Sequence, residues 1–343
     1  MSKISKLSLL QNRQGEIALA IYADNGQTGS GAFREPSAAE AMLYLPEIAK
    51  TLHGKDALSY EQNLLSVKNL RLEKNINLPM GMLSAIDSAL LELSAKGLSL
   101  PVYQLLGGKV REKISFAAEE SFILENGIES GIAIVRLFGG AYYGREGMKK
   151  NLQQIEEAAS KLPKKVRILL DCHQGWDSEY MVRMVREFKN YNIRYKKLPL
   201  AGAGYETMRR YRDLLNPNGI MLSPTETAYT LYSARELISR RCADQIRCDI
   251  HSCGGIAELK KIAAYAQANG VMLIPVGADH VTLHFAASSL VSPFIELTET
   301  PEEAFFGRGR RNGAAFYTEE LPGFGKTFPG KAFSQDIKII FSQ

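Results

Sequence analysis

The chain has 343 residues, of which 45% are hydrophobic, enough to bury one large core together with a smaller domain. Lysine plus arginine exceeds aspartate plus glutamate by 42 to 37 without a basic block, which excludes the charge pattern of a nucleic-acid-binding protein. No stretch approaches the roughly 20 uninterrupted apolar residues of a membrane span. The four cysteines form no CxxC pair and the N-terminus has no signal-peptide pattern, so we expect a cytoplasmic protein with reduced thiols.

Residues 1 to about 110 predict an α+β module. The stretches ISKLSLL and EIALAIYADNGQTGSGAF are typical of strands in an antiparallel meander, and Asp24-Asn25-Gly26 supplies residues that suit a tight turn. A helical stretch follows from about Ser37. A second helix, MGMLSAIDSALLELSAKG, is strongly periodic and ends at Gly97.

After LLGGKV the pattern becomes a repeat of short apolar strand, turn and amphipathic helix. Eight strands that alternate with helices, without GxGxxG after the first, favour a closed (β/α)8 TIM-type barrel over a doubly wound sheet. The predicted strands are 113–119, 132–138, 166–172, 193–198, 220–226, 244–250, 271–277 and 294–299, and the predicted helices include 148–162, 178–189, 233–241 and 256–269.

Polar side chains gather where these strands end, which is where barrel enzymes place their chemistry. Loops are polar in most proteins, so one such residue alone carries little weight. A ring of mixed charges, however, brings acid, base and cation within reach of one ligand. The residues at these ends are Arg136, Asp171, His173, Lys196, Lys197, Thr225, Glu226, Asp249, His251, His280 and Glu296.

The sequence contains the long motifs SAIDSALLELSAKGLSLPVYQLLGGKVREKISFAA, LLDCHQGWD, DIHSCGGIAELKKIAAYAQANGV and HFAASSL. These motifs resemble the mandelate racemase and muconate lactonizing branch of the enolase superfamily. The resemblance implies a modified (β/α)8 barrel, placed at residues 111–318. It also implies an α+β capping domain, formed by residues 1–110 and completed by residues 319–343.

The resemblance further implies a lyase or isomerase, of the dehydratase, racemase or cycloisomerase type, that acts on a small carboxylate such as an acid sugar. In that family a base removes the proton next to the substrate carboxylate, and Mg²⁺ held by three carboxylates stabilises the enediolate. The expected partner is therefore a small-molecule carboxylate, and relatives are commonly homo-oligomers.

The metal ligands of the family match this sequence at only one acidic position. Asp171 matches the first ligand, Lys197 stands at the second, and Thr225 stands at the third. Glu226, one residue along, could serve if a bulge ended the strand. Mg²⁺ is thus expected from the resemblance, while two of its three ligand positions are substituted.

The acid-base residues have changed as well. Arg136 stands where the family's second strand carries a lysine base, and Asp249 matches an aspartate that pairs with a histidine of the seventh strand. That histidine position falls on Val276, so His280, four residues on, is the predicted partner of Asp249 in a base dyad. Substrate binding is assigned to His173, His251 and Glu296.

Lys197 has several interpretations. Its ammonium could offset carboxylate or enolate charge in place of the metal, with Arg136 alongside, in a charge-assisted hydrogen bond of about 1.5 to 3 kcal/mol. It could also be a base or a Schiff-base nucleophile. The structural alternative is a salt bridge to Asp171 or Glu226. Lys196, by strand alternation, should point outward between barrel and helices.

Three hypotheses follow for the whole protein. The first is a lyase or isomerase that uses Lys197 in part of the metal's place. The second is a non-catalytic descendant that binds a metabolite or a partner protein. The third is a metal enzyme with a rebuilt site of Asp171, Glu226 and a histidine such as His173, which would suit a transition metal better than Mg²⁺.

Overall fold

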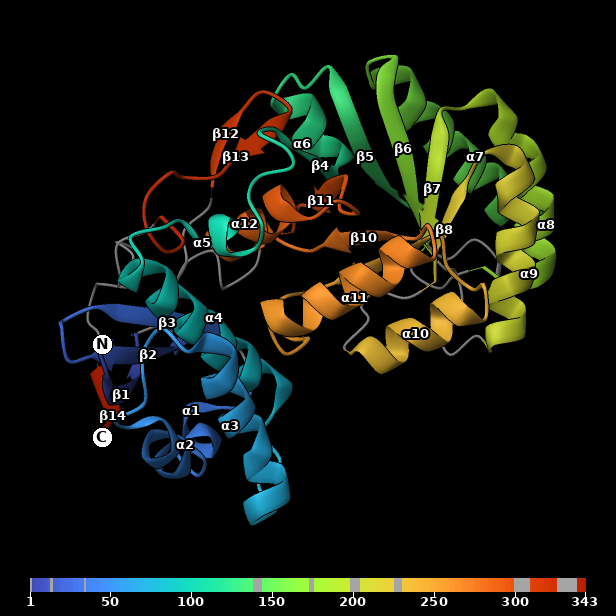
Figure 1. Ribbon diagram of the computed structural model, residues 1–343. Helices are drawn as coiled ribbons and strands as arrows, with labels where there is room; N and C mark the ends of the chain where they lie inside the picture. The colour runs from blue at the N-terminus through green and yellow to red at the C-terminus, as the bar shows by residue number, and fades with distance from the viewer. Residues whose placement is uncertain are drawn as a thin grey trace.

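The structure, a computed structural model, describes residues 2–12, 15–33, 35–137, 144–172, 176–197, 204–224, 230–298, 309–325 and 338–343. Figure 1 shows two parts, a smaller one that holds both chain ends and a larger one built from the strands and helices from β4 onward. None of the described helices is both long and apolar enough to cross a membrane.

The smaller part, the capping domain, contains a four-stranded antiparallel sheet. The predicted meander is confirmed, and its Asp24-Asn25-Gly26 turn places Gly26 at a φ of 84°. The last strand of the chain pairs with the first, which brings residues 338–342 back to this sheet. The strands are β1 (Ile4–Gln11), β2 (Ile17–Ala23), β3 (Thr28–Phe33) and β14 (Lys338–Ser342).

Helix α4, the predicted periodic helix, packs directly on the capping sheet. A Cβ atom on Gly29 or Gly31 of β3 would lie within 2.0 Å of a carbonyl oxygen of α4, so only glycine permits this backbone approach. The helices of this part are α1 (Ala38–Ala41), α2 (Leu45–Leu52), α3 (Tyr60–Lys74), α4 (Met80–Gly97) and the connecting α5 (Val102–Leu105).

Eight parallel strands of the described residues form the barrel. Ladders join β4 through β8 in order, β9 pairs with β10, and β11 closes onto β4. Asp244 links β8 to β9, because its N–H donates to Leu222 O (3.0 Å) and its carboxylate accepts from Leu222 N (2.8 Å). The strands are β4 (Ile114–Glu119), β5 (Ser130–Arg136), β6 (Lys165–Asp171), β7 (Ile193–Lys197), β8 (Met221–Ser223), β9 (Gln245–Cys248), β10 (Met272–Pro275) and β11 (Phe294–Glu296).

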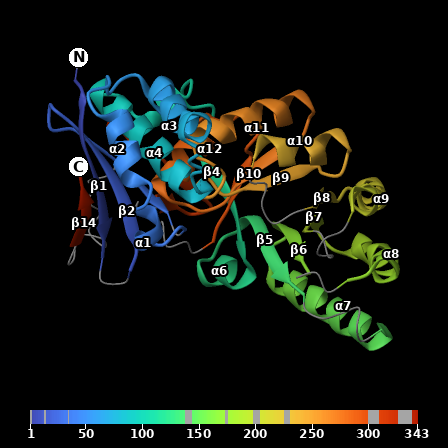
Figure 2. The ribbon, with the colours of Figure 1, turned by 90° about the horizontal axis from the view of Figure 1, so that it is seen from below.

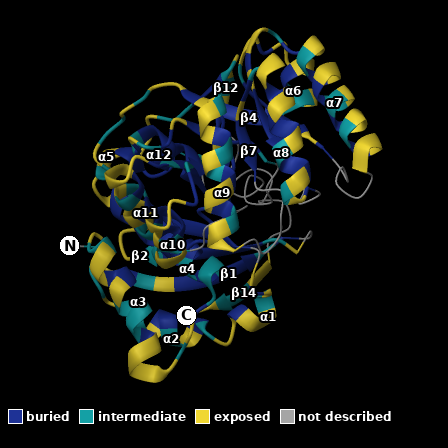
Figure 3. Ribbon diagram, turned by 90° about the vertical axis from the view of Figure 1, so that its right-hand side faces the viewer, coloured by how far each residue is buried: buried dark blue, intermediate teal, exposed yellow. Residues whose placement is uncertain are grey.

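Helices cover the outside of the barrel. In α7 the buried residues Gly147, Asn151, Ile155 and Ala158 recur every three to four positions, so one face packs inward. Figure 3 shows exposed residues along the outer sides of α7 and α9. The helices are α6 (Glu120–Glu125), α7 (Gly144–Lys161), α8 (Ser178–Glu187), α9 (Tyr205–Leu215), α10 (Leu231–Ser239), α11 (Ile256–Ala268) and α12 (His280–Ser288), and short 3₁₀ turns follow α8 (Phe188–Asn190) and α9 (Asn216–Asn218).

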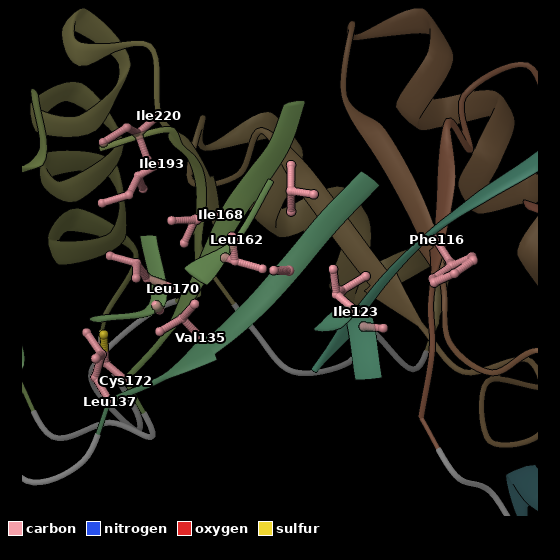
Figure 4. Close-up of a cluster of buried hydrophobic side chains, with 14 of the residues drawn as sticks. Phe116, Ile123, Val135, Leu137, Leu162, Ile168, Leu170, Cys172, Ile193 and Ile220 are labelled. Carbon is pink, nitrogen blue, oxygen red and sulfur yellow. The ribbon is translucent and has the colours of Figure 1, made fainter. Parts of the chain in front are cut away.

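Alternate strand residues form two separate cores. One set fills the barrel interior, and it comprises Ala117, Ile132, Ile134, Leu169, Tyr195, Ile274 and Phe294. The other set packs under the helices, and Figure 4 shows Ile168, Leu170 and Cys172 of the β6 segment in this outer cluster. The two-residue period therefore decides which side chains reach the barrel mouth.

The alternation of strands and helices is confirmed, and a hairpin was missed. β12 (Arg310–Asn312) and β13 (Ala315–Tyr317) form an antiparallel pair, and β13 also pairs with β4. Strands of three residues are too short to show a two-residue alternation in the sequence. The domain boundaries near residues 110 and 318 stay predictions.

His284 of α12 makes stability depend on pH. Its Nδ1 accepts a hydrogen bond from the Tyr103 N–H (3.2 Å), and burial lowers the pKa of its ring from 6.5 to about 3. Below about pH 6.5 the unfolded chain binds a proton at this ring, whereas the folded chain does not. The free energy of unfolding therefore decreases as the pH decreases. Between about pH 7.5 and pH 5 we expect wild type to lose about 2 kcal/mol more than His284→Asn, measured by urea denaturation. Equal losses would contradict this.

Candidate active site

Four charged side chains close the apolar interior of the barrel at its carboxyl end. Asp171 of β6, Lys197 of β7 and Glu296 of β11 each stand two positions after an apolar residue of the interior cluster, so all three face inward. Arg247 of β9 joins them through Glu296. The four side chains are at most 8% exposed.

The ammonium of Lys197 lies between two carboxylates. Its Nζ is 2.9 Å from Asp171 Oδ2 and 2.9 Å from Glu296 Oε1. The alternative of a salt bridge to Asp171 is therefore correct, and the second partner is Glu296. With its Nζ bound to both carboxylates, Lys197 is placed as a donor, which argues against its use as a base or Schiff-base nucleophile.

Glu296 is held on both oxygens. Arg247 Nε lies 2.5 Å from Oε2 and an Arg247 Nη 2.6 Å from Oε1, the forked geometry that guanidinium and carboxylate favour. Burial alone would raise the pKa of Glu296, but the charges of Arg247 and Lys197 and their hydrogen bonds lower it below its usual value. Glu296, assigned to substrate binding from the sequence, is thus an ionised acceptor for two cations.

Lys197 keeps donor capacity beyond these two contacts. An ammonium has three N–H donors. Among the described residues, only Asp171 and Glu296 accept from it. Within the described part of the chain, the third N–H has no further acceptor.

Arg136, at the end of β5, lies beside this group. Its Cα pairs with that of Asp171 in the β5–β6 ladder, and its Nε donates to Glu119 Oε1 (2.8 Å). The guanidinium is 40% exposed, whereas the Lys197 side chain is 8% exposed. Arg136 therefore lies at the mouth on its solvent side, and its role there stays a prediction.

Lys196 faces the other way, as strand alternation predicts. It is fully buried, its Nζ lies 2.7 Å from Cys172 Sγ, and it stands over the ring of Trp176 at 3.9 Å from the centroid. Cys172 belongs to the cluster under the helices. Lys196 therefore has no place in the mouth.

Three predicted site residues, His173, Thr225 and Glu226, lie outside the described residues. Asp249 is described, and its carboxylate accepts from the His251 N–H (2.9 Å) and from Ser252 Oγ (2.9 Å), so it stabilises its own loop. None of these contacts of Asp249 is to His280, which is the first residue of α12, and the dyad stays a prediction.

A different histidine–aspartate pair forms at this end of the barrel. His251 Nε2 lies 3.2 Å from Asp279 Oδ2, and both side chains are at most 3% exposed. Asp279 also caps α12, accepting from the N–H groups of Val281 (2.9 Å) and Thr282 (3.1 Å). Burial would raise the pKa of Asp279, but the charge of His251 and hydrogen bonds from His251 and Thr282 lower it to about 2. The carboxylate therefore fixes the imidazole orientation.

Sequence reasoning missed Arg247 and Asp279, although each left a signal. Arg247 is a charged residue inside an apolar strand and two positions before Asp249, so it shares the inward face. Asp279 directly precedes a helix, the usual place of a capping aspartate. Their partners, Glu296 and His251, are distant in sequence and only the fold identifies them.

The described residues do not fit the magnesium ion that the resemblance implies. A divalent cation of this kind prefers several oxygen ligands. Here the ammonium of Lys197 already lies between the Asp171 and Glu296 carboxylates. Nowhere in the described part of the chain do three His, Cys, Asp or Glu side chains gather as a metal site.

Comparisons with known proteins agree with this architecture. The sequence matches the family model "Enolase C-terminal domain-like" over residues 124–330. It matches "Mandelate racemase / muconate lactonizing enzyme, N-terminal domain" over residues 8–107.

Similar proteins include acid-sugar dehydratases. L-rhamnonate dehydratase of Saccharopolyspora erythraea is 29% identical over 294 residues, which cover 83% of this chain and 73% of the relative. L-talarate dehydratase from Polaromonas sp. JS666, complexed with Mg and L-glucarate, superposes with a TM-score of 0.79 at 22% identity, with 99% of each chain covered. An enolase superfamily member from Salmonella Typhimurium gives a TM-score of 0.79 at 18% identity, covering 99% of this chain and all of the other. The chain belongs to the enolase superfamily, in its mandelate racemase and muconate lactonizing enzyme subgroup.

Proposed function

We propose that the protein is a hydro-lyase-type enzyme that removes the proton next to the carboxylate of a small acid sugar, with the ammonium of Lys197 in the place of the divalent cation. The observation that carries the proposal is the position of Lys197 Nζ, 2.9 Å from both Asp171 and Glu296 at the strand ends. The names of the rhamnonate and talarate dehydratases support the substrate class.

The third N–H of Lys197 would donate to the substrate oxygen that gains charge as the proton leaves. A preorganised donor in a desolvated site stabilises such an oxyanion strongly, and removal of one typically costs about 10²- to 10³-fold in rate. Asp171 and Glu296 hold the ammonium in place, and Arg247 balances the charge of Glu296. The cation is therefore fixed before the substrate arrives.

His251 is the proposed base. Since Nε2 faces the ionised Asp279, Nδ1 is the nitrogen that can accept a proton. In a dehydration the α-proton would pass to His251 and the bond electrons would move toward the carboxylate. The β-hydroxyl would then leave as water, taking from His251 the proton that it had accepted. Roles for Arg136 and His280 at the mouth, and a homo-oligomeric state, stay predictions.

The proposal is tested with a panel of acid sugars and small hydroxy acids in D₂O. Proton NMR of each compound would reveal exchange of the α-proton even without turnover. We expect exchange for at least one acid sugar, together with formation of a 2-keto acid. Saturable binding without exchange across the panel would instead support the non-catalytic descendant.

Lys197→Glu offers a separate test of the cation's place. This change sets a third carboxylate beside Asp171 and Glu296, so we expect the melting temperature to fall without metal and to recover with millimolar Mg²⁺. Saturation at about 100 times the dissociation constant would restore about 2.7 kcal/mol. Lys197→Met, which cannot bind a metal ion, should show no recovery. Equal Mg²⁺ responses in both variants and in wild type would show that the ion binds elsewhere.

A further inference from the structure

Helix α4 of the capping domain reaches across to the barrel and caps one of its helices. Asp87, on α4, is fully buried, and its carboxylate accepts from the N–H groups of Ile256 (2.6 Å) and Ala257 (3.3 Å), the first two residues of α11. α11 has no side-chain cap of its own. Figure 2 shows α4 and α11 on adjoining sides of the two parts.

A second contact lies one helical turn away on the same face of α4. Ser84 Oγ accepts from the N–H of Gly254 (2.9 Å), so two α4 side chains together bind three backbone N–H groups at and just before the start of α11. The approach is close, because a Cβ atom on Gly255 would lie 2.3 Å from the Asp87 carboxylate. Gly254 and Gly255 both have positive φ, which fits the glycine pair in the HSCGG motif.

The same loop carries His251. At its other end the Asp249 carboxylate accepts from the His251 N–H, and the N–H groups of Ser252 and Cys253 donate to Asp249 O. The loop from Asp249 to Gly255 is thus tied to β9 at its start and to the capping domain at its end. His251 lies between the two anchors, with its ring against Asp279.

From these contacts we infer that Ser84 and Asp87 are positioning residues, by which the capping domain sets the orientation of the His251 imidazole. The inference rests on the proposed function only in calling His251 the base. Burial raises the pKa of Asp87 to about 6, so near pH 7.5 its ionised carboxylate also favours the positive end of α11. Docking of the capping domain and geometry of the base are therefore coupled.

The test follows the His251 ring by NMR in the full chain. The protein has five histidines, and the ring signals that vanish in His251→Asn assign this one. Ser84→Ala removes one loop contact without a charge change, and Asp87→Asn weakens the other. Ser94→Ala is the matched control, because Ser94 Oγ, on the same helix, bonds to Leu58 O inside the capping domain.

We expect both Ser84→Ala and Asp87→Asn to displace the His251 ring signals near pH 7.5 and to speed exchange of the Ile256 amide, whereas Ser94→Ala leaves both unchanged. Unmoved His251 signals in both variants would overturn the inference. This readout needs no substrate, so it tests the positioning inference separately from the proposed function. Displaced His251 signals would support the inference even if no acid sugar showed α-proton exchange, a result that would contradict the proposed function. With an active acid sugar, Ser84→Ala should lower kcat by about ten- to a hundredfold with a smaller change in KM.

Discussion

Lys197→Met is expected to lower α-proton exchange by about 10²- to 10³-fold, because it removes the donor that we propose for the developing oxyanion. It also leaves Asp171 without its buried cation, while Glu296 retains Arg247. Removal of one partner from a buried ion pair costs about 3 kcal/mol of unfolding free energy. Exchange is followed by proton NMR in D₂O, and stability by urea denaturation.

Lys196→Met provides the matched control. It is the same substitution one residue away, on a side chain that contacts Cys172 and Trp176 under the helices. We expect exchange at the wild-type rate. If the two variants lose activity equally, the effect comes from damage to β7, and Lys197 has no special role in the chemistry.

His251→Asn should abolish most of the exchange, by about 10²- to 10⁴-fold, which is the usual contribution of a positioned base. The substrate should still bind, because Lys197 and Arg136 remain. Asp279→Asn keeps the imidazole but removes the carboxylate 3.2 Å from Nε2 that orients the ring, so its loss of exchange should be smaller than that of His251→Asn.

The control for the histidine change is His53→Asn, at the end of α2 in the capping domain. It should leave exchange and its pH profile unchanged. An active His251→Asn variant would contradict the assignment of the base and would return His280 to consideration.

Much of the fold follows from local rules that the sequence carries openly. The two-residue period placed Asp171 and Lys197 at neighbouring strand ends, and it sent Lys196 to the outer face. The Asp24-Asn25-Gly26 turn and the periodic helix α4 likewise depend on residues that are close together in the chain.

The missing part of the site depends on distant residues. Glu296 binds Lys197 and Arg247 from 99 and 49 positions away, a choice that only barrel closure makes. The dyad was predicted from Asp249, after β9, and His280, after β10. The structure pairs His251 with Asp279 from the same two connections, because Asp249 folds onto its own turn and Asp279 caps α12.

Burial of four charges in one layer is costly unless every charge is paired. Here two cations and two anions balance, and each carboxylate has at least one cationic partner. The charges therefore balance among these four residues. Under the proposed function, Lys197 would then supply the positive charge for proton chemistry at a site where two acidic ligand positions are substituted.

The most direct test of the fixed-cation account is the rate of α-proton exchange on the responding acid sugar after exhaustive chelation, with and without added Mg²⁺. If Lys197 supplies the positive charge, chelated protein exchanges at the full rate and Mg²⁺ leaves that rate unchanged. Exchange that vanishes with chelation and returns with Mg²⁺ would contradict the account.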